Sequence, residues 1–126
     1  MGSRGRQKIP QQTRTSMEKI KSKIIFGDTK LRKEFEKLKK HDSDIYKQIE
    51  KAFDNLEENP FCGIQIPKKL IPKEYINKFG PISNLWKYNL PDAWRLIYTV
   101  KNNKIDILSV ILEWLDHKEY ERRFNY

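Results

Sequence analysis

The chain has 126 residues, of which 37% are hydrophobic and 34% charged, and its formal net charge is +9. This length supports one domain with a single modest core, and the excess of lysine and arginine favours polyanionic partners. The one cysteine excludes an internal disulfide and agrees with a reducing compartment. No apolar run is long enough for a membrane span or a signal peptide, so a cytoplasmic protein with no membrane partner is expected.

The N-terminal part of the chain divides into an arm and the start of a domain. Residues 1–17 contain almost nothing to bury, so we expect a flexible basic arm followed by a single domain over residues 18–126. Residues 23–26 are a short apolar strand candidate, and Asp28 or Thr29 can cap the helix that follows.

Two amphipathic helices joined by a short turn come next. Apolar residues recur at helical spacing in both, first Leu31, Phe35 and Leu38, then Ile45, Ile49, Ala52, Phe53 and Leu56. Such a helical hairpin needs a partner surface for its apolar stripes. Residues 63–84 contain three prolines and several short apolar pieces, so we expect an ordered connection there.

Three antiparallel strands and a short basic helix are predicted after residue 84. Residues 85–90 and 94–100 are rich in aromatic and β-branched side chains and are separated by Pro91-Asp92-Ala93, while Asn102-Asn103 suits a two-residue turn before the third strand. The predicted fold class is α+β, with a small, twisted, antiparallel-rich sheet in the order β-α-α-β-β-β. The helical hairpin packs on one face of this sheet, and a short helix ends the chain.

Strand pairing predicts which side chains share a face of the sheet. The first hairpin pairs Asn89 with Arg95 and Lys87 with Ile97, and a two-residue second turn pairs Arg95 with Val110. One face then forms the core and carries Trp86, Tyr88, Leu90, Trp94, Leu96, Tyr98, Val100, Ile105, Ile107 and Ile111. The other face is half polar and carries Lys87, Asn89, Arg95, Thr99 and Asp106 among Ile97, Leu108, Val110 and Leu112.

The titratable residues exclude most familiar catalytic classes. His41, His117 and Cys62 lack partners at metal-ligand spacings, and there is no glycine-rich phosphate loop, so no metal and no cofactor is expected. A nucleophilic pair of Cys62 and His117 is less favoured than a packing role for Cys62 in its apolar surroundings.

A cationic group on one sheet face remains, with His117 and Tyr120 following the third strand toward the same end. This set suits RNA cleavage, because RNA supplies its own nucleophile, the 2′-hydroxyl, and needs only a base, an acid and a cation from the protein. Arginine stabilises developing phosphate charge, and histidine exchanges protons near neutral pH.

The segment LWKYNLPDAWRLIYTV, after two charged helices and before DHKEYERRF, resembles the RelE/ParE superfamily of toxins from type II toxin–antitoxin modules. WRLIYTV is its most specific piece, and the likeness in element order covers about residues 23–124. The resemblance is closer to the mRNA-cleaving RelE and YoeB branches. It implies a toxin that cleaves mRNA on the ribosome, inhibits translation and is neutralised by a cognate antitoxin.

The same resemblance implies roles for individual residues. Arg95 matches the phosphate-stabilising arginine of the family and Lys87 the first lysine of its strand pair, whereas Asn89 replaces the second lysine. His117 resembles the catalytic histidine of the YoeB branch and Tyr120 the C-terminal tyrosine of RelE, with acid and base left open. The expected RNA-binding residues are Lys68, Lys69, Asn89, Lys118, Arg122 and Arg123, and the expected antitoxin-docking strip is Leu108, Val110 and Leu112.

Two rival functions stay open on the same fold. One is a ParE-like toxin that acts on DNA gyrase, and the other is a non-catalytic RNA- or protein-binding domain, which the missing second lysine favours. Plain structural roles also stay open for the candidate residues: Arg95 as a surface strand residue, His117 as a helix cap and Tyr120 as a core residue.

Overall fold

The computed structural model describes residues 20–41, 43–103 and 105–125, so the predicted arm, residues 1–17, lies outside the described residues. Its strands form one sheet in the order β2-β6-β5-β4-β3, with β2 parallel to β6 and the other pairs antiparallel. The strands are β2 (Lys23–Phe26), β3 (Ile64–Ile66), β4 (Leu85–Asn89), β5 (Arg95–Asn102) and β6 (Ile107–Leu115). The helices are α2 (Thr29–Lys40), α3 (Asp44–Glu58), α4 (Lys73–Phe79) and α5 (His117–Phe124), with short 3₁₀ turns η1 (Lys68–Leu70) and η2 (Pro91–Ala93). The predicted α+β class is confirmed.

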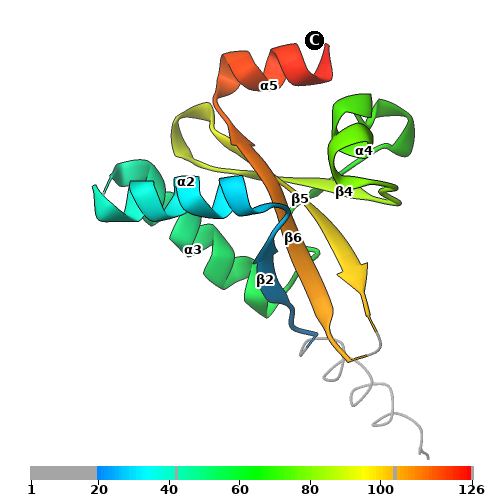
Figure 1. The fold of residues 1–126 in the computed structure, drawn as a ribbon, viewed down its shortest axis with the longest axis horizontal. Coiled ribbons are helices and arrows are strands. Elements are labelled where there is room, and N and C mark those ends of the chain that lie inside the picture. The colour runs from blue at the N-terminus through cyan, green and yellow to red at the C-terminus, as the bar shows by residue number, and fades with distance from the viewer. Residues whose placement is uncertain (1–19, 42, 104, 126) are drawn as a thin grey trace, which may run out of the picture.

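The helical hairpin α2–α3 covers one face of the sheet, as predicted (Figure 1). Both helices begin at a side-chain cap: Asp28 accepts a hydrogen bond from the Leu31 amide at 2.7 Å, and Ser43 accepts one from the Tyr46 amide at 3.2 Å. The apolar stripe of α3 is buried against the strands. This first core consists of Ile49, Ala52, Leu56, Leu90, Leu96, Tyr98 and Ile111, surrounded by half-buried aromatic residues from β2, α2, α3, β4 and β6 and by Trp94.

The opposite face of the sheet is also buried, which corrects its prediction as a half-polar surface. Two unpredicted elements explain the difference, because β3 and α4 form within the connection of residues 63–84 and α4 packs on this face with α5. The second core contains Ile66, Tyr75, Ile82, Leu85, Ile97, Val110, Leu112, Leu115, Tyr120 and Phe124. Val110 and Leu112 are only 7% and 2% exposed, so the predicted antitoxin-docking strip is wrong.

The register of the first hairpin is confirmed, whereas that of the second is wrong. Lys87 pairs with Ile97 and Asn89 with Arg95, as expected. In the second hairpin Asn102 pairs with Ile107, so the turn is longer than two residues. The Asn103 side chain accepts hydrogen bonds from the amides of Ile105 and Asp106, and Ile105 is 89% exposed and not in the core.

A register shift in β5–β6, between Ile97 and Tyr98, changes what β6 presents to α4 and α5. Tyr98 pairs with Ile111, but Ile97 pairs with Glu113, and Arg95 pairs with Leu115 and not with Val110. Leu112 and Glu113 therefore both face α4 and α5: Leu112 lies in the second core, and Glu113 contacts α5.

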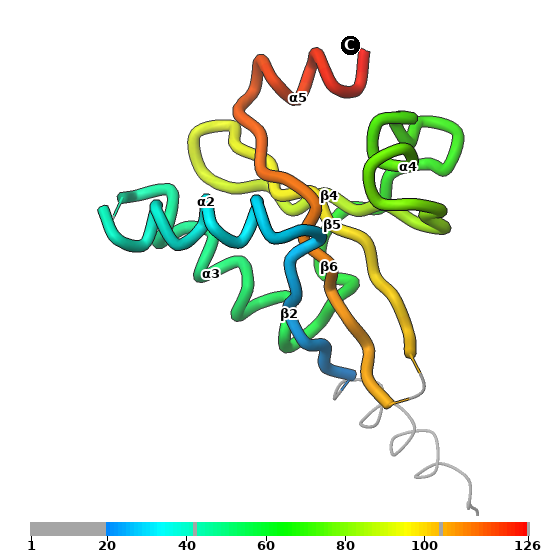
Figure 2. The backbone as a smooth tube through the Cα atoms, viewed as in Figure 1, coloured from blue at the N-terminus to red at the C-terminus, as the bar shows by residue number. Residues whose placement is uncertain are grey.

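The arrangement brings the end of β6 and the β4–β5 loop to one end of the molecule. The backbone trace in Figure 2 shows this loop and α5 at the end opposite the β5–β6 turn. The residues of β4, β5 and α5 that were predicted to be functional therefore share one end of the second face.

Candidate functional site

Lys87 of β4 and Arg95 of β5 converge on Tyr120 of α5. Lys87 Nζ donates a hydrogen bond to the Tyr120 hydroxyl at 3.2 Å. Lys87 Nζ and Arg95 Cζ each lie 5.1 Å from the centroid of the Tyr120 ring, within the range of cation–π attraction. Three of the four predicted catalytic residues are thus brought together, although β4, β5 and α5 are separate in the chain.

The Arg95 guanidinium is held by the loop that precedes it. Its Nη1 donates to the carbonyl oxygen of Ala93 at 2.6 Å. Asp92 and Ala93 have positive φ angles of 60° and 63°, a backbone conformation that costs energy for any residue with a side chain. Arg95 Nε is buried and has no hydrogen-bond partner among the described residues. The Arg95 side chain is thus fixed through Nη1, and its Nε is a donor without a partner among the described residues.

Among the described residues, no carboxylate forms an ion pair with either cation. In the described ranges, the ion pairs of arginine and lysine involve Lys21, Lys23, Lys78 and Arg123, and none includes Lys87 or Arg95. Buried or half-buried cations ordinarily have an anionic partner. The Tyr120 ring offsets part of the repulsion between the two charges, and the site retains a strong preference for an anion.

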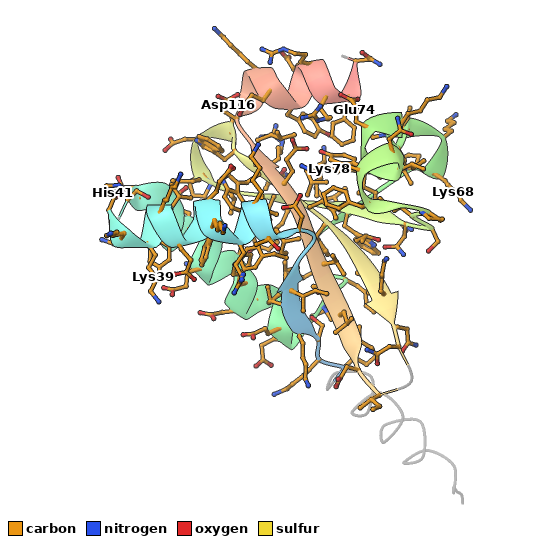
Figure 3. All side chains as sticks on the ribbon, in the orientation of Figure 1. Lys39, His41, Lys68, Glu74, Lys78 and Asp116 are labelled. Carbon is orange, nitrogen blue, oxygen red and sulfur yellow. The ribbon has the colours of Figure 1, made fainter. Side chains whose placement is uncertain are left out.

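His117 lies apart from this group. It begins α5 after the N-cap Asp116, whose side chain and that of Glu119 form a capping box. Figure 3 labels Asp116 at this end of the helix. The His117 side chain is 56% exposed, and its Nε2 lies 3.2 Å from Glu121 on the same helix. Within the described chain it makes no hydrogen bond with Lys87, Arg95 or Tyr120.

Comparison with known proteins identifies the family. The family model of the ParE toxin of type II toxin–antitoxin systems, parDE, matches residues 28–112, which is more than half of the chain. The chain belongs to the ParE toxin family. The resemblance to the RelE/ParE superfamily is thereby confirmed, and membership implies an antitoxin partner. Searches of curated proteins and of solved structures found no match.

The family match covers only part of the site of this ParE-family toxin. Residues 28–112 include Lys87 and Arg95, but Glu113 and all of α5 follow the matched segment. The roles of His117 and Tyr120 therefore depend on the chain's own geometry. No helix in the described part of the toxin is both long and apolar enough to cross a lipid bilayer.

The residues predicted to bind RNA lie in three places in the toxin. Lys68 and Lys69 are exposed on η1, Asn89 is exposed at the end of β4, and Lys118 and Arg122 are exposed on α5. Figure 3 shows Lys68 far from Asp116 across the molecule. Arg123 differs, because carboxylates on β6 and α4 compensate its charge. These assignments stay predictions, with Arg123 the weakest of them.

Sequence reasoning missed the carboxylates that surround Arg123. Glu113 accepts hydrogen bonds from Arg123 Nε at 3.2 Å and from Nη2 at 2.6 Å, and Glu74 of α4 accepts one from Nη1. Glu113 reaches α5 only because of the register shift in β5–β6, which no residue pattern signals. Glu74 was missed because the seven-residue helix α4 is too short to show a periodicity.

Proposed function

We propose that this toxin is an endoribonuclease that cleaves mRNA on the ribosome: the 2′-hydroxyl attacks the adjacent phosphate, the bond to the 5′-oxygen breaks, and a 2′,3′-cyclic phosphate and a 5′-hydroxyl result. Neither a metal nor a cofactor takes part. The observation that carries the proposal is the pair of cations Lys87 and Arg95, held together by Tyr120 and without an ion-pair partner among the described residues. A phosphate group is the anion that an arginine fork and a neighbouring ammonium fit best.

In this proposal Arg95 binds the scissile phosphate and stabilises the charge that develops on its oxygens. Its Nη1 is already engaged by Ala93, which fixes the fork, and its free Nε has been desolvated in advance. A donor that is fixed before the reaction costs no reorganisation in the transition state. Lys87 supplies the second positive charge beside the same phosphate.

His117 is assigned a proton transfer, either from the attacking 2′-hydroxyl or to the departing 5′-oxygen. Imidazole exchanges protons near neutral pH, and the exposed His117 ring is open to solvent and substrate. Tyr120 is only 3% exposed and accepts a hydrogen bond from Lys87, so its part is to hold the two cations in place. The exposed cations Lys68, Lys69, Lys118 and Arg122 then contact phosphates along the bound RNA.

A second candidate target is DNA gyrase. The observation that favours it is the family itself, since the matching model is that of the ParE toxin. The cationic site would then bind a protein or DNA surface in place of mRNA. The uncompensated pair Lys87–Arg95 supports the ribonuclease more strongly, because it fits a phosphate in a reacting position.

Primer extension on total RNA after brief induction distinguishes the two targets. The variants are wild type, Arg95→Ala, His117→Ala and Lys51→Ala, the last an exposed lysine on α3 at the other face of the sheet. We expect cleavage within translated messages by wild type and Lys51→Ala. Arg95→Ala should lower it by about 10²–10³-fold, as for loss of one oxyanion-stabilising donor. His117→Ala should lower it as well.

Two results would contradict the ribonuclease. Growth arrest with intact messages, together with inhibited supercoiling by purified gyrase, would identify the gyrase target. Equal cleavage by wild type and a folded Arg95→Ala variant would remove Arg95 from the site. Circular dichroism and a thermal midpoint for each variant show that a lost activity is not a lost fold.

A further inference from the structure

Helix α5 is too short to hold its own position. It spans eight residues, and isolated helices of that length are not stable in water. Its capping box and the left-handed Asn125 at its C-terminus satisfy backbone groups of the helix but do not attach it to the sheet. Its buried residues are Tyr120 and Phe124, whose rings lie 4.6 Å apart. The seating of α5 therefore depends on contacts with other elements.

Besides the Lys87–Tyr120 hydrogen bond, Arg123 makes polar contacts that join α5 to the rest of the fold. Its Nε and Nη2 form a two-point pair with the Glu113 carboxylate of β6, and its Nη1 bonds to Glu74 of α4. The guanidinium also lies 5.8 Å from the centroid of the Tyr75 ring of α4. Figure 3 shows Glu74 in the space between α4 and α5. One side chain thus ties three elements together, and we name Glu74, Glu113 and Arg123 the α5 clamp.

The α5 clamp is not an ordinary surface ion pair. The side chains of Glu113 and Arg123 are only 21% and 30% exposed, and the bidentate geometry fixes both planes. The hydrogen bond to Glu113 is the main cause that raises the pKa of Arg123 above its ordinary value; burial opposes it, and the Glu113 charge and the hydrogen bond to Glu74 add to the increase. The Arg123 guanidinium therefore stays protonated in the folded protein.

Tyr120 stands one helical turn before Arg123, on the same face of α5. A shift of α5 that broke the clamp would also move the Tyr120 ring away from Lys87 and Arg95. Without that ring, the two cations would lose the cation–π contacts and the hydrogen bond that hold them together. The position of Tyr120 in the candidate site therefore depends on the α5 clamp, one helical turn away.

We infer that Arg123 is a positioning residue, which seats α5 through Glu113 and Glu74 and thereby keeps Tyr120 between Lys87 and Arg95. Its effect on catalysis rests on the proposed ribonuclease function, whereas its effect on α5 does not. The inference gives Arg123 a different role from RNA binding. It also makes Glu113, which lies outside the family-matched segment, part of the functional unit.

Amide hydrogen exchange followed by mass spectrometry tests the seating of α5 without any ribonuclease assay. Peptides covering residues 116–125 are compared in wild type, Arg123→Met, Arg123→Lys, Glu74→Gln and the control Arg122→Met. We expect exchange in α5 to speed up about tenfold or more in Arg123→Met, with the strands unchanged. Arg123→Lys keeps the charge but cannot bond both carboxylates through a fork, so its exchange should be intermediate.

Glu74→Gln removes only the charge of the more exposed carboxylate and keeps an oxygen that can accept from Arg123, so it is the milder variant should loss of Arg123 unfold the protein. The Glu74 side chain is 61% exposed, and a modest acceleration of α5 exchange is expected. Arg122 is exposed on the same helix and forms no ion pair among the described residues, so Arg122→Met should leave α5 unchanged. Equal α5 exchange in wild type, Arg123→Met and Glu74→Gln would overturn the clamp.

Nitration by tetranitromethane reports on Tyr120 directly. The ring is 3% exposed and should be protected in wild type but react in Arg123→Met, as read by mass spectrometry of the α5 peptide. Protection of Tyr120 in a variant whose α5 exchanges rapidly would overturn the link between the clamp and the site. Both measurements stand even if the toxin cleaves no RNA, so a failed ribonuclease proposal is distinguishable from a failed clamp.

RNA cleavage then tests the catalytic consequence. For Arg123→Met we expect kcat to fall with a smaller change in KM, because the site loses its transition-state geometry more than its charge. Arg123→Lys should recover part of the rate, in step with its α5 exchange. A loss confined to KM in Arg123→Met, with unchanged kcat, would overturn the positioning role and make Arg123 an RNA contact.

Discussion

Ala93 has a strained backbone conformation and lies two residues before Arg95 of the candidate site. It adopts φ 63° and directs its carbonyl oxygen to Arg95 Nη1. For an L-residue the left-handed region costs about 1–2 kcal/mol, and glycine adopts it without that cost. Strained backbone is found more often at functional sites than elsewhere, which agrees with the place of Ala93 beside the candidate site.

Ala93→Gly should therefore raise the free energy of unfolding by roughly 0.5–1 kcal/mol, since relief of the strain exceeds the added entropy of the unfolded chain. Ala52→Gly makes the same chemical change in α3, where the residue is 1% exposed, and should lower it by about 1 kcal/mol or more. Urea titration followed by circular dichroism measures both. A loss of stability in Ala93→Gly would show that the loop is not strained.

Tyr75 carries a buried hydroxyl that makes no hydrogen bond within the described chain. Its pKa is raised, first by burial and then by the nearby Glu113 carboxylate, so the phenol stays neutral. Tyr75→Phe should leave the ring packing intact and raise the free energy of unfolding by up to about 1 kcal/mol, because an unsatisfied polar group is removed. A drop in stability on urea titration would reveal a hydrogen bond that the present geometry lacks.

At the scale of elements, Asp28 joins the start of α2 to α4. It caps α2 through the Leu31 amide and lies 3.3 Å from Lys78 of α4. The hydrogen bond from the Leu31 amide is the main cause that lowers the pKa of Asp28, with Lys78 adding to the effect and partial burial opposing it. The ionised form thus stabilises the folded state.

A depressed folded-state pKa gives stability that is present above the ordinary aspartate value of 3.8 and is lost as the pH falls through the lowered value. Asp28→Asn keeps a cap but removes this titration, so the difference in stability between it and wild type should shrink from pH 5 toward about pH 2. Asp28→Ala should cost about 1 kcal/mol at neutral pH. Thermal midpoints across that pH range decide whether the carboxylate charge matters.

The sequence predicts those elements that are long enough to show a hydrophobic periodicity or that are marked by a turn signal a few residues long. The hairpin β4–β5 has its predicted register because Pro91-Asp92-Ala93 fixes the loop length, and this is what places Lys87 near Arg95. The elements β3 and α4 have three and seven residues, too few for a periodicity to emerge. The second turn was misjudged because the side chain of Asn103 closes a longer loop.

The same reasoning explains which parts of the site were predictable. Tyr120 follows β6 closely enough for chain order to bring it to Lys87 and Arg95. The α5 clamp was not predictable, because Glu113 turns toward α5 only through a register shift, and Glu74 lies on a helix that the pattern does not reveal. A contact that depends on a register shift of one residue is determined by packing across the whole sheet, so the local sequence does not predict it.

At the scale of the molecule, one sheet separates two cores that share β5 and β6. The helical hairpin covers one core, and α4 with α5 covers the other. Because β5 and β6 contribute residues to both cores, neither layer should persist without the other. We expect a single two-state unfolding transition.

Two optical probes test this cooperativity. The three tryptophans, Trp86, Trp94 and Trp114, all pack in the first core, whereas far-ultraviolet circular dichroism reports on the whole chain. Urea transitions from fluorescence and circular dichroism should coincide. Loss of dichroism at lower urea than the fluorescence change would mean that α4 and α5 unfold as a separate unit.

The position of β6 in the sheet determines how late in synthesis the toxin can fold. β6 lies between β2 and β5, although among the described residues β2 is the first strand and β6 the last. A growing polypeptide therefore has neither core until its final strand emerges, and Tyr120 arrives later still. The candidate site should thus form only after β6 and α5 have both been synthesised.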